Sequence, residues 1–263
     1  VEKVLSMRFQ RLVKVVGAGR TDGGVHARGQ AMHFDLYKNE TTAEDFEQQL
    51  ELTISRMLPS DIRAWNVNRA TPTLIVEGQS PPPGYYNWNA MRSCDGKLYS
   101  YRICIGDSMD PIDRYNRWQL PWQGVDPSNL RDILKKFEGE HDFVCFAGAL
   151  EQQEKKTGVA PGTVRTIQRI DFVHEVNGNN DAMCNPSQDY YRIDIYLDGA
   201  LYKMVRNIVG TAIDVARGWL DETKFEELLN QPSEFNYVRK DNPCKPAPAN
   251  GLTLERVFYP DDF

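Results

Sequence analysis

The pattern of hydrophobic and polar residues in the first part of the chain changes from helical spacing to strand-like spacing. It predicts a helix followed by two strands. Apolar residues at helical spacing open the sequence, at Val1, Val4 and Leu5. Residues 12–16 form a short apolar run, and residues 30–36 alternate between apolar and polar side chains. Both patterns are typical of strands.

A second helix is predicted after residue 42. Thr42 is a candidate N-cap with Asp45 three residues later, and apolar residues then fall on one helix face at Phe46, Leu50, Ile54 and Met57. A strand over residues 62–67 completes the order αββαβ. One more strand ahead of residue 1, which we infer is missing from this sequence, would give βαββαβ, the ferredoxin-like arrangement.

The second half repeats this order with longer elements. We expect a strand, a helix, two strands, two helices and a last strand, over residues 98–105, 127–137, 164–174, 190–198, 201–218, 223 onwards and 252–258. Asp126 is the expected N-cap of the first of these helices, with Pro127 at its first position. Thr223 and Glu226 form a candidate capping box for the last helix.

The repeated order predicts an α+β fold of two ferredoxin-like halves related by pseudo-twofold symmetry. Each half would have a mixed or antiparallel sheet with helices on one face, and a central catalytic cleft would lie between the halves. The Pro-rich stretch 79–84 is the expected linker. The N-terminal half is therefore residues 1–84 and the C-terminal half residues 85–263. Polar stretches at 151–162 and 177–188 are predicted as loop insertions.

Composition narrows the class of protein. The chain has 263 residues, 41% of them hydrophobic, which is enough for a substantial core. No apolar run approaches the ~20 residues that span a bilayer, and no signal peptide pattern opens the sequence. Five widely spaced cysteines without a Cys-x-x-Cys pair favour reduced thiols in an intracellular protein over a disulfide framework or a zinc site. We expect no metal and no cofactor.

Net charge weighs against nucleic-acid binding if it is taken alone, because the chain carries −6 at pH 7 and RNA-binding domains usually present a basic patch. The basic residues, however, gather near the motifs discussed below. They are Arg20, Arg28, Arg92, Lys97, Arg102, Arg114, Arg117, Arg165, Lys203 and Arg206. A basic cleft on an acidic body is compatible with both observations.

The candidate chemistry lies in residues 17–30, where five of fourteen residues are glycine. Asp22 is the carboxylate of this stretch, between Arg20 and Arg28, and the predicted strands on both sides place it on a loop. The order of residues fits neither a P-loop nor a dinucleotide-binding loop. One interpretation is a functional carboxylate; the other is a hairpin whose Asp only binds turn amides.

The stretch Gly19-Arg20-Thr21-Asp22-Gly23-Gly24-Val25-His26-Ala27 resembles the catalytic loop of the TruA family of tRNA pseudouridine synthases. Further segments resemble that family in the same order, and the resemblance spans residues 1 to about 260. They are residues 97–103, 139–143, 163–167, 202–210 and 248–252. The resemblance implies an isomerase that converts uridine to pseudouridine in tRNA by base flipping. It implies no cofactor, and a homodimer as in the bacterial members.

The resemblance also assigns roles to four residues. Asp22 matches the catalytic nucleophile, and Arg206 matches its ion-pair partner. The helical spacing itself puts Arg206 near one stripe of the helix predicted over 201–218, with Lys203, Asn207 and Gly210. Tyr99 matches the tyrosine that stacks on the target uracil. Arg20 matches the arginine that fills the position that the flipped base leaves.

Four alternatives stay open from the residues themselves. Tyr99 and Tyr101, two positions apart on a strand, are often core residues, and a helix arginine such as Arg206 is often solvated. The chain could be a catalytically silent RNA-binding protein, because ferredoxin-like folds also bind RNA without chemistry. It could also be an enzyme that acts on a small molecule with a carboxylate nucleophile.

Overall fold

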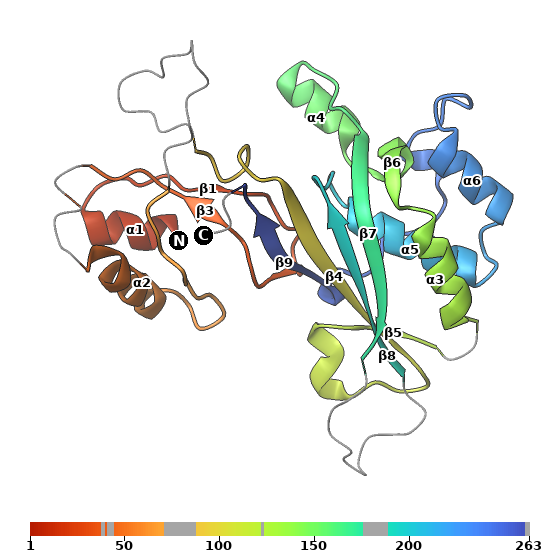
Figure 1. Cartoon of the computed structure of the whole chain (residues 1–263), viewed down its shortest axis with the longest axis horizontal. Coiled ribbons are helices and arrows are strands. Elements are labelled where there is room, and N and C mark those ends of the chain that lie inside the picture. Colours follow the sequence, from red (N-terminus) through yellow and green to blue (C-terminus); the bar gives the residue numbers. More distant parts are fainter. Residues whose placement is uncertain (38–39, 41–44, 71–87, 122–123, 176–188, 261–263) are drawn as a thin grey trace. The chain divides into compact units, whose positions relative to one another are not determined.

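The computed structural model describes residues 1–37, 40, 45–70, 88–121, 124–175 and 189–260 (Figure 1). By their contacts the residues form two units. The first unit combines Val1–Arg20 with Gln30–Cys94, and the second combines Thr21–Gly29 with Asp95–Phe263. Three predicted features lie outside the described residues: the boundary at 84–85, the N-cap Thr42 and the loop 177–188.

The first unit packs two helices around a small apolar core. Helices α1 (Glu2–Phe9) and α2 (Phe46–Met57) accompany a two-stranded antiparallel sheet of β1 (Val16–Gly17) and β3 (Met32–His33). Apolar side chains at helical spacing on α1 and α2 meet here, as the pattern predicts. The core consists of Val4, Leu5, Val13, Phe46, Leu50, Ile54 and Leu58.

The predicted strand at 62–67 is wrong, because side chains of α2 bind its backbone. The Ser55 hydroxyl donates to the Ala64 carbonyl oxygen at 2.7 Å and accepts from the Ala64 N–H at 3.2 Å. The Glu51 carboxylate accepts from the Val67 N–H at 3.0 Å. These groups take the hydrogen bonds that a neighbouring strand would have made. Met57 is predicted on the apolar face of α2 but is exposed. The next residue, Leu58, lies in the core instead.

The second unit is built on a mixed seven-stranded sheet, in agreement with the mixed or antiparallel sheet of the predicted α+β fold. Its order is β2 (His26–Ala27), β9 (Leu252–Phe258), β4 (Gly96–Ile105), β8 (Asp189–Leu197), β7 (Val164–His174) and β6 (Gly139–Asp142), with β5 (Trp118–Leu120) paired to β4. The pairs β2–β9 and β4–β5 are parallel, and the other neighbours are antiparallel. The strands predicted at 164–174 and 252–258 are confirmed to the residue.

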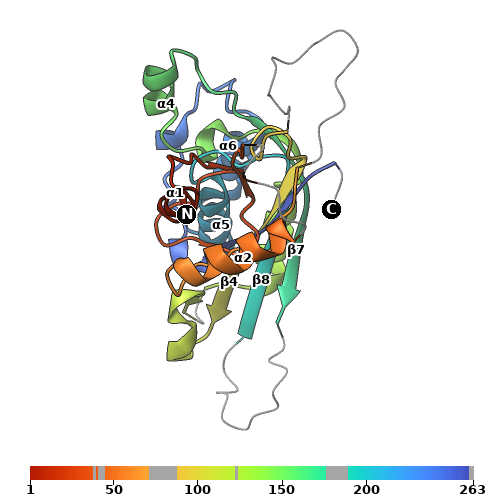
Figure 2. The same cartoon turned by 90° about the vertical axis from the view of Figure 1, so that its left-hand side faces the viewer.

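Helices α3 (Pro127–Lys135), α5 (Met204–Ala216) and α6 (Glu222–Asn230) gather on one face of this sheet (Figures 1 and 2). The predicted Asp126 cap of α3 is confirmed, since its carboxylate accepts from the Ser128 N–H at 3.0 Å. None of the helices in the described ranges is long and apolar enough to cross a membrane.

Two predictions for the second unit need correction. Helix α6 begins after Asp221, whose carboxylate accepts from the backbone N–H groups of Thr223 and Lys224, so the Thr223 capping box does not form. The stretch 151–162, predicted as a loop, contains helix α4 (Leu150–Thr157). None of the α4 residues is buried, and the stretch therefore lacks the apolar spacing by which a helix is recognised.

Candidate active site

Asp22 and Arg206 form an ion pair within the second unit. Nη1 of Arg206 donates to Oδ2 of Asp22 at 2.7 Å, and the two side chains are only 15% and 16% exposed. A largely buried carboxylate is costly without a cation beside it. The pairing that the sequence assigns to these two residues is therefore present, and Arg206 is not a solvated helix residue.

The loop that carries Asp22 is fixed to the end of the sheet. Strand β2 pairs in parallel with β9, and the backbone N–H groups of Arg28 and Gly29 both donate to the Leu254 carbonyl oxygen, at 2.8 and 3.3 Å. A Cβ at Gly29 would collide with the Glu255 carbonyl oxygen, so this close approach needs glycine. Although the sequence assigns this loop to the N-terminal half, residues 21–29 belong to the second unit by their contacts.

Arg206 is held at a second point, which the sequence does not reveal. Its Nε donates to the Ala247 carbonyl oxygen at 2.7 Å, and the Ala247 N–H donates back to the Arg206 carbonyl oxygen at 2.9 Å. The segment that contains Lys245 and Ala247 can pack closely against α5 because Gly210 has no side chain. A Cβ at Gly210 would collide with the Lys245 carbonyl oxygen. The guanidinium therefore has one fixed orientation toward Asp22.

Helix α5 is buried on nearly every side, so the predicted stripe of Arg206, Asn207 and Gly210 does not face solvent as a whole. Asn207 is buried and donates to the Phe146 carbonyl oxygen at 2.6 Å, while its own Oδ1 accepts from Arg239 at 3.0 Å. Burial lowers the pKa of Arg239 from its ordinary value. These contacts fix the helix that presents Arg206.

Tyr99 and Tyr101 are both buried in β4. Tyr99 lies opposite Leu254 of β9 and Ile195 of β8. The Tyr101 hydroxyl donates to the Pro248 carbonyl oxygen at 2.7 Å, and its ring packs against Gly251. Burial raises the pKa of Tyr101, and the nearby Arg206 charge partly offsets that rise. Tyr101 is a core residue beside the ion pair.

Arg20 belongs to the first unit, and its side chain is exposed. It stands two residues before Asp22 in the chain. The structure thus pairs Asp22 with Arg206, and it places Tyr99 on the sheet that anchors the Asp22 loop.

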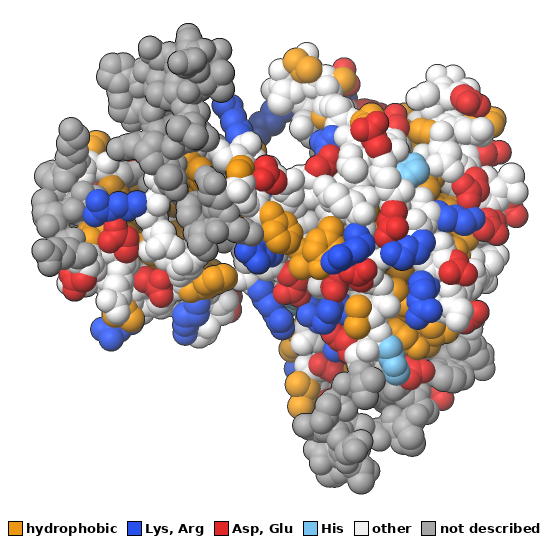
Figure 3. All heavy atoms as spheres, in the orientation of Figure 1, with side chains coloured by type: hydrophobic (Ala, Val, Ile, Leu, Met, Phe, Trp, Pro, Cys, Tyr) orange, Lys and Arg blue, Asp and Glu red, His pale blue; other side chains and the backbone are white. Residues whose placement is uncertain are grey.

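Several of the basic residues near the motifs are neutralised by carboxylates. Arg102 pairs with Glu255 at 3.0 Å, and Arg117 pairs with Glu175 at 2.6 Å. Figure 3 shows basic and acidic side chains next to one another over the strands of the second unit. Arg28, although exposed, also lies near Glu255, at 3.8 Å, so these three arginines do not support the expected basic cleft; Arg114 of the same set is exposed.

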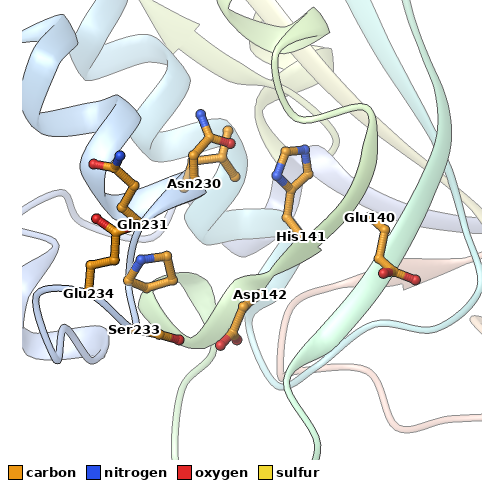
Figure 4. A pocket seen from close by; sticks show the side chains of 9 residues that line it. Glu140, His141, Asp142, Asn230, Gln231, Ser233 and Glu234 are labelled. Carbon is orange, nitrogen blue, oxygen red and sulfur yellow. The ribbon is translucent and has the colours of Figure 1, made fainter.

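A separate pocket lies between β6 and the end of α6 (Figure 4). None of the four predicted site residues lines it; the lining is Glu140, His141, Asp142, Leu229, Asn230, Gln231, Pro232, Ser233 and Glu234. Within the described ranges, no three His, Cys, Asp or Glu residues are grouped so that they could hold a metal ion.

Comparison with known proteins finds one family and a set of relatives. Residues 133–260 match the model of the family described as tRNA pseudouridine synthase. A tRNA pseudouridine synthase A 1 of Protochlamydia amoebophila is 31% identical over 95% of this chain and 81% of its own length. The tRNA pseudouridine synthase A of Listeria monocytogenes is 30% identical (98% and 88%), and that of Thermodesulfovibrio yellowstonii is 27% identical (98% and 88%).

Proposed function

Because the chain belongs to the tRNA pseudouridine synthase A family, we propose that it isomerises uridine to pseudouridine in tRNA with Asp22 as the nucleophile. The reaction breaks the bond between C1′ of the ribose and N1 of uracil, turns the base and rejoins it through C5. The proton at C5 is lost to solvent, and N1, which no longer carries the ribose, takes up a proton from solvent in exchange. No atom has to be supplied by a second substrate, and the enzyme is an intramolecular transferase.

The observation that carries the proposal is the Asp22–Arg206 pair. A carboxylate can add covalently to the substrate and leave again, or it can remove a proton. Both uses need the ionised form in a site that excludes water, and burial alone opposes that form. The Arg206 guanidinium supplies the opposing charge, and its bond to Ala247 keeps that charge in place.

Two further residues complete the proposed site. Tyr99 stacks on the target uracil, a contact that tolerates rotation of the base because it depends only on a flat surface. Arg20 fills the position that the flipped uridine leaves in the RNA stack. These roles rest on the match of both residues to the family motifs.

The detailed architecture is also part of the proposal. In the second unit, β4, α3, β7, β8, α5 and β9 occur in this sequence order, with β5, β6, α4 and α6 inserted between them, and the strands lie in the order β9-β4-β8-β7. This arrangement supports a ferredoxin-like C-terminal half. The matching N-terminal half, the cleft and the homodimer stay predictions. Because tRNA is made and used inside cells, we propose an intracellular protein.

A catalytically silent RNA-binding protein is the second candidate, and it is not favoured. Such a protein has no need for a partly buried carboxylate held by an arginine 184 residues away in the sequence. An enzyme acting on a small molecule would keep the carboxylate but would not need RNA.

Release of tritium from tRNA transcripts labelled as [5-³H]uridine separates these candidates. The proposed enzyme releases tritium and leaves pseudouridine, identified by nucleoside analysis of the product. A silent RNA-binding protein retains the transcripts on a filter without releasing tritium. A small-molecule enzyme does neither, and either of the last two results would overturn the proposed function.

A further inference from the structure

A short helix beside the Asp22 loop carries an exposed aromatic side chain that the proposed chemistry does not use. The 3-10 helix Pro111–Tyr115, yellow-green beside β5 in Figure 1, lies between β4 and β5. Tyr115 is 65% exposed. An exposed tyrosine on a well-anchored segment provides a flat surface for a ligand at little cost in conformational entropy.

The segment is attached directly to the loop of the nucleophile. Nε2 of His26 lies 2.6 Å from the Tyr115 carbonyl oxygen; since a carbonyl only accepts, Nε2 carries the shared proton. His26 follows Asp22 by four residues, which bounds their Cα separation at about 14 Å. The loop that carries Asp22 and the segment that carries Tyr115 are therefore joined by a direct hydrogen bond.

A second clamp holds the same segment from the other side. The Asn250 side-chain amide donates to the carbonyl oxygens of Arg114 and Arg117, at 2.9 and 2.6 Å. Asn250 follows Pro248, which accepts the hydrogen bond of Tyr101, and Ala247, which orients Arg206. One short stretch, residues 247–250, thus positions both the Arg206 guanidinium and the backbone beneath Tyr115.

Arg114 and Tyr115 form a pair of the kind that binds single-stranded nucleic acid. The Arg114 guanidinium carbon lies 4.1 Å from the centre of the Tyr115 ring, a cation–π contact. One of its five N–H groups donates to the Pro111 carbonyl oxygen at 2.5 Å. Arginine and aromatic side chains together contact phosphates and stack bases in proteins that bind unpaired strands.

We propose that the Arg114–Tyr115 pair binds a nucleotide next to the target uridine, with Tyr115 stacked on its base and Arg114 on its phosphate. The inference rests on the proposed function, because it assumes that the Asp22 site acts on RNA. The pair contributes to the position of the RNA strand and touches no reacting atom. It holds the strand on one side of the nucleotide that is flipped.

The chain provides a control in a second cation–π pair, whose aromatic ring is exposed and whose arginine is partly buried. Arg217 lies 4.8 Å from the Trp219 ring, and Trp219 is 74% exposed. This pair follows the last residue of α5, eleven residues after Arg206, which is about 16 Å along a helix axis. It has the same chemistry at the opposite end of the helix that carries Arg206.

The test measures the tRNA dissociation constant and the single-turnover tritium release rate of Tyr115→Ala, Tyr115→Phe and Trp219→Ala. Loss of one base–aromatic stack should raise the dissociation constant of Tyr115→Ala about fivefold or more. Tyr115→Phe keeps a ring and should match the wild type, as should Trp219→Ala. An unchanged dissociation constant and rate for Tyr115→Ala would overturn the inference, and so would an equal effect of Trp219→Ala.

Arg114→Gln tests the phosphate contact independently. Removing one such contact should reduce the slope of log affinity against log salt by about 0.7 to 0.9, and an unchanged slope would contradict the assigned phosphate contact. Wild-type tritium release, measured alongside, keeps the two proposals distinguishable. If the wild type releases no tritium, the proposed function fails; if it does and the Tyr115 and Arg114 variants match it, only this inference fails.

Discussion

Arg206 and Asp22, 184 positions apart in the sequence, meet at 2.7 Å between Nη1 and Oδ2. Two separate parts of the chain create this distance. The pairing of β2 with β9 fixes the loop of Asp22, and the contact of Ala247 with α5 fixes the guanidinium. The reactivity of Asp22 should therefore depend on residues that never touch RNA.

Arg206→Ala should inactivate the enzyme and destabilise the fold. Removing one member of a buried ion pair leaves an uncompensated charge, which costs ~3 kcal/mol or more; the residual exposure of this pair favours the lower value. Urea unfolding and tritium release measure the two effects. Arg206→Lys keeps the charge but cannot hold Asp22 and Ala247 in one plane, and should recover stability better than activity. Full activity of Arg206→Ala would show that the pair is not needed.

Gly210→Ala should disturb the site through the contact between α5 and the segment that contains Lys245 and Ala247. The added Cβ would collide with the Lys245 carbonyl oxygen and lie 3.0 Å from the Ala247 nitrogen, so the segment that orients Arg206 has to move. We expect a loss of ~1–3 kcal/mol in the free energy of unfolding, with a lower turnover rate at saturating tRNA. Gly162→Ala is the matched control, because nothing lies within 4 Å of a Cβ there. Equal turnover rates for both variants would contradict this account.

Tyr99→Ala and Tyr101→Ala should differ in kind. Tyr99→Ala is expected to slow single-turnover tritium release more than it weakens tRNA binding, because phosphate contacts elsewhere supply most of the affinity. Tyr101→Ala removes a fully buried ring and the bond to Pro248, and should lower the free energy of unfolding by ~3–5 kcal/mol. A normal rate for Tyr99→Ala would assign base stacking to another residue.

Strands β4, β7, β8 and β9 of the second unit could be predicted closely because their patterns are local, whereas the short strands β2, β5 and β6 were not predicted. Strands β7 and β9 match the predicted residues 164–174 and 252–258. In both stretches apolar residues recur, and no glycine or proline interrupts them. The stretch 62–67 has a similar pattern, but Ser55 and Glu51 bind its backbone. Whether side chains or a neighbouring strand bind the backbone of such a stretch depends on the tertiary structure. The local pattern of apolar residues does not reveal it.

The candidate site could be predicted only in part. The pair of Asp22 and Arg206 follows from two motifs that resemble one family. The support for that pair does not follow, because Ala247 holds the Arg206 guanidinium through its backbone carbonyl oxygen. Backbone contacts of this kind place little demand on residue type, and they become visible only once the chain is folded.

Cysteine reactivity should separate buried from accessible thiols. Burial raises the pKa of Cys145 and of Cys244 to about 12, from an ordinary value of 9.0. Both thiols stay protonated in the folded protein at pH 8, and they should resist alkylation that modifies the partly exposed Cys94. Mass mapping after iodoacetamide treatment measures this, and rapid native labelling of Cys145 would contradict its burial.

The same pKa shifts predict a decline in stability at high pH. A pKa raised by folding means that the unfolded chain loses its thiol protons first. The stability that these two thiols contribute is fully present below pH 9 and is lost as the pH rises toward 12. Urea unfolding of the wild type and of Cys145→Ala between pH 8 and 10.5 should show a smaller decline for the variant. Equal declines would contradict the shift at Cys145.

The most direct test of the catalytic role of Asp22 is tritium release by Asp22→Asn, measured beside its tRNA affinity and thermal midpoint. The substitution keeps the size of the side chain and an oxygen that accepts from Arg206, but it removes the charge and the nucleophile. We predict no tritium release above background, with tRNA affinity close to that of the wild type and a thermal midpoint lowered less than that of Arg206→Ala, because the amide oxygen still accepts from Arg206. Release at more than a few per cent of the wild-type rate would contradict the assignment of Asp22 as the nucleophile.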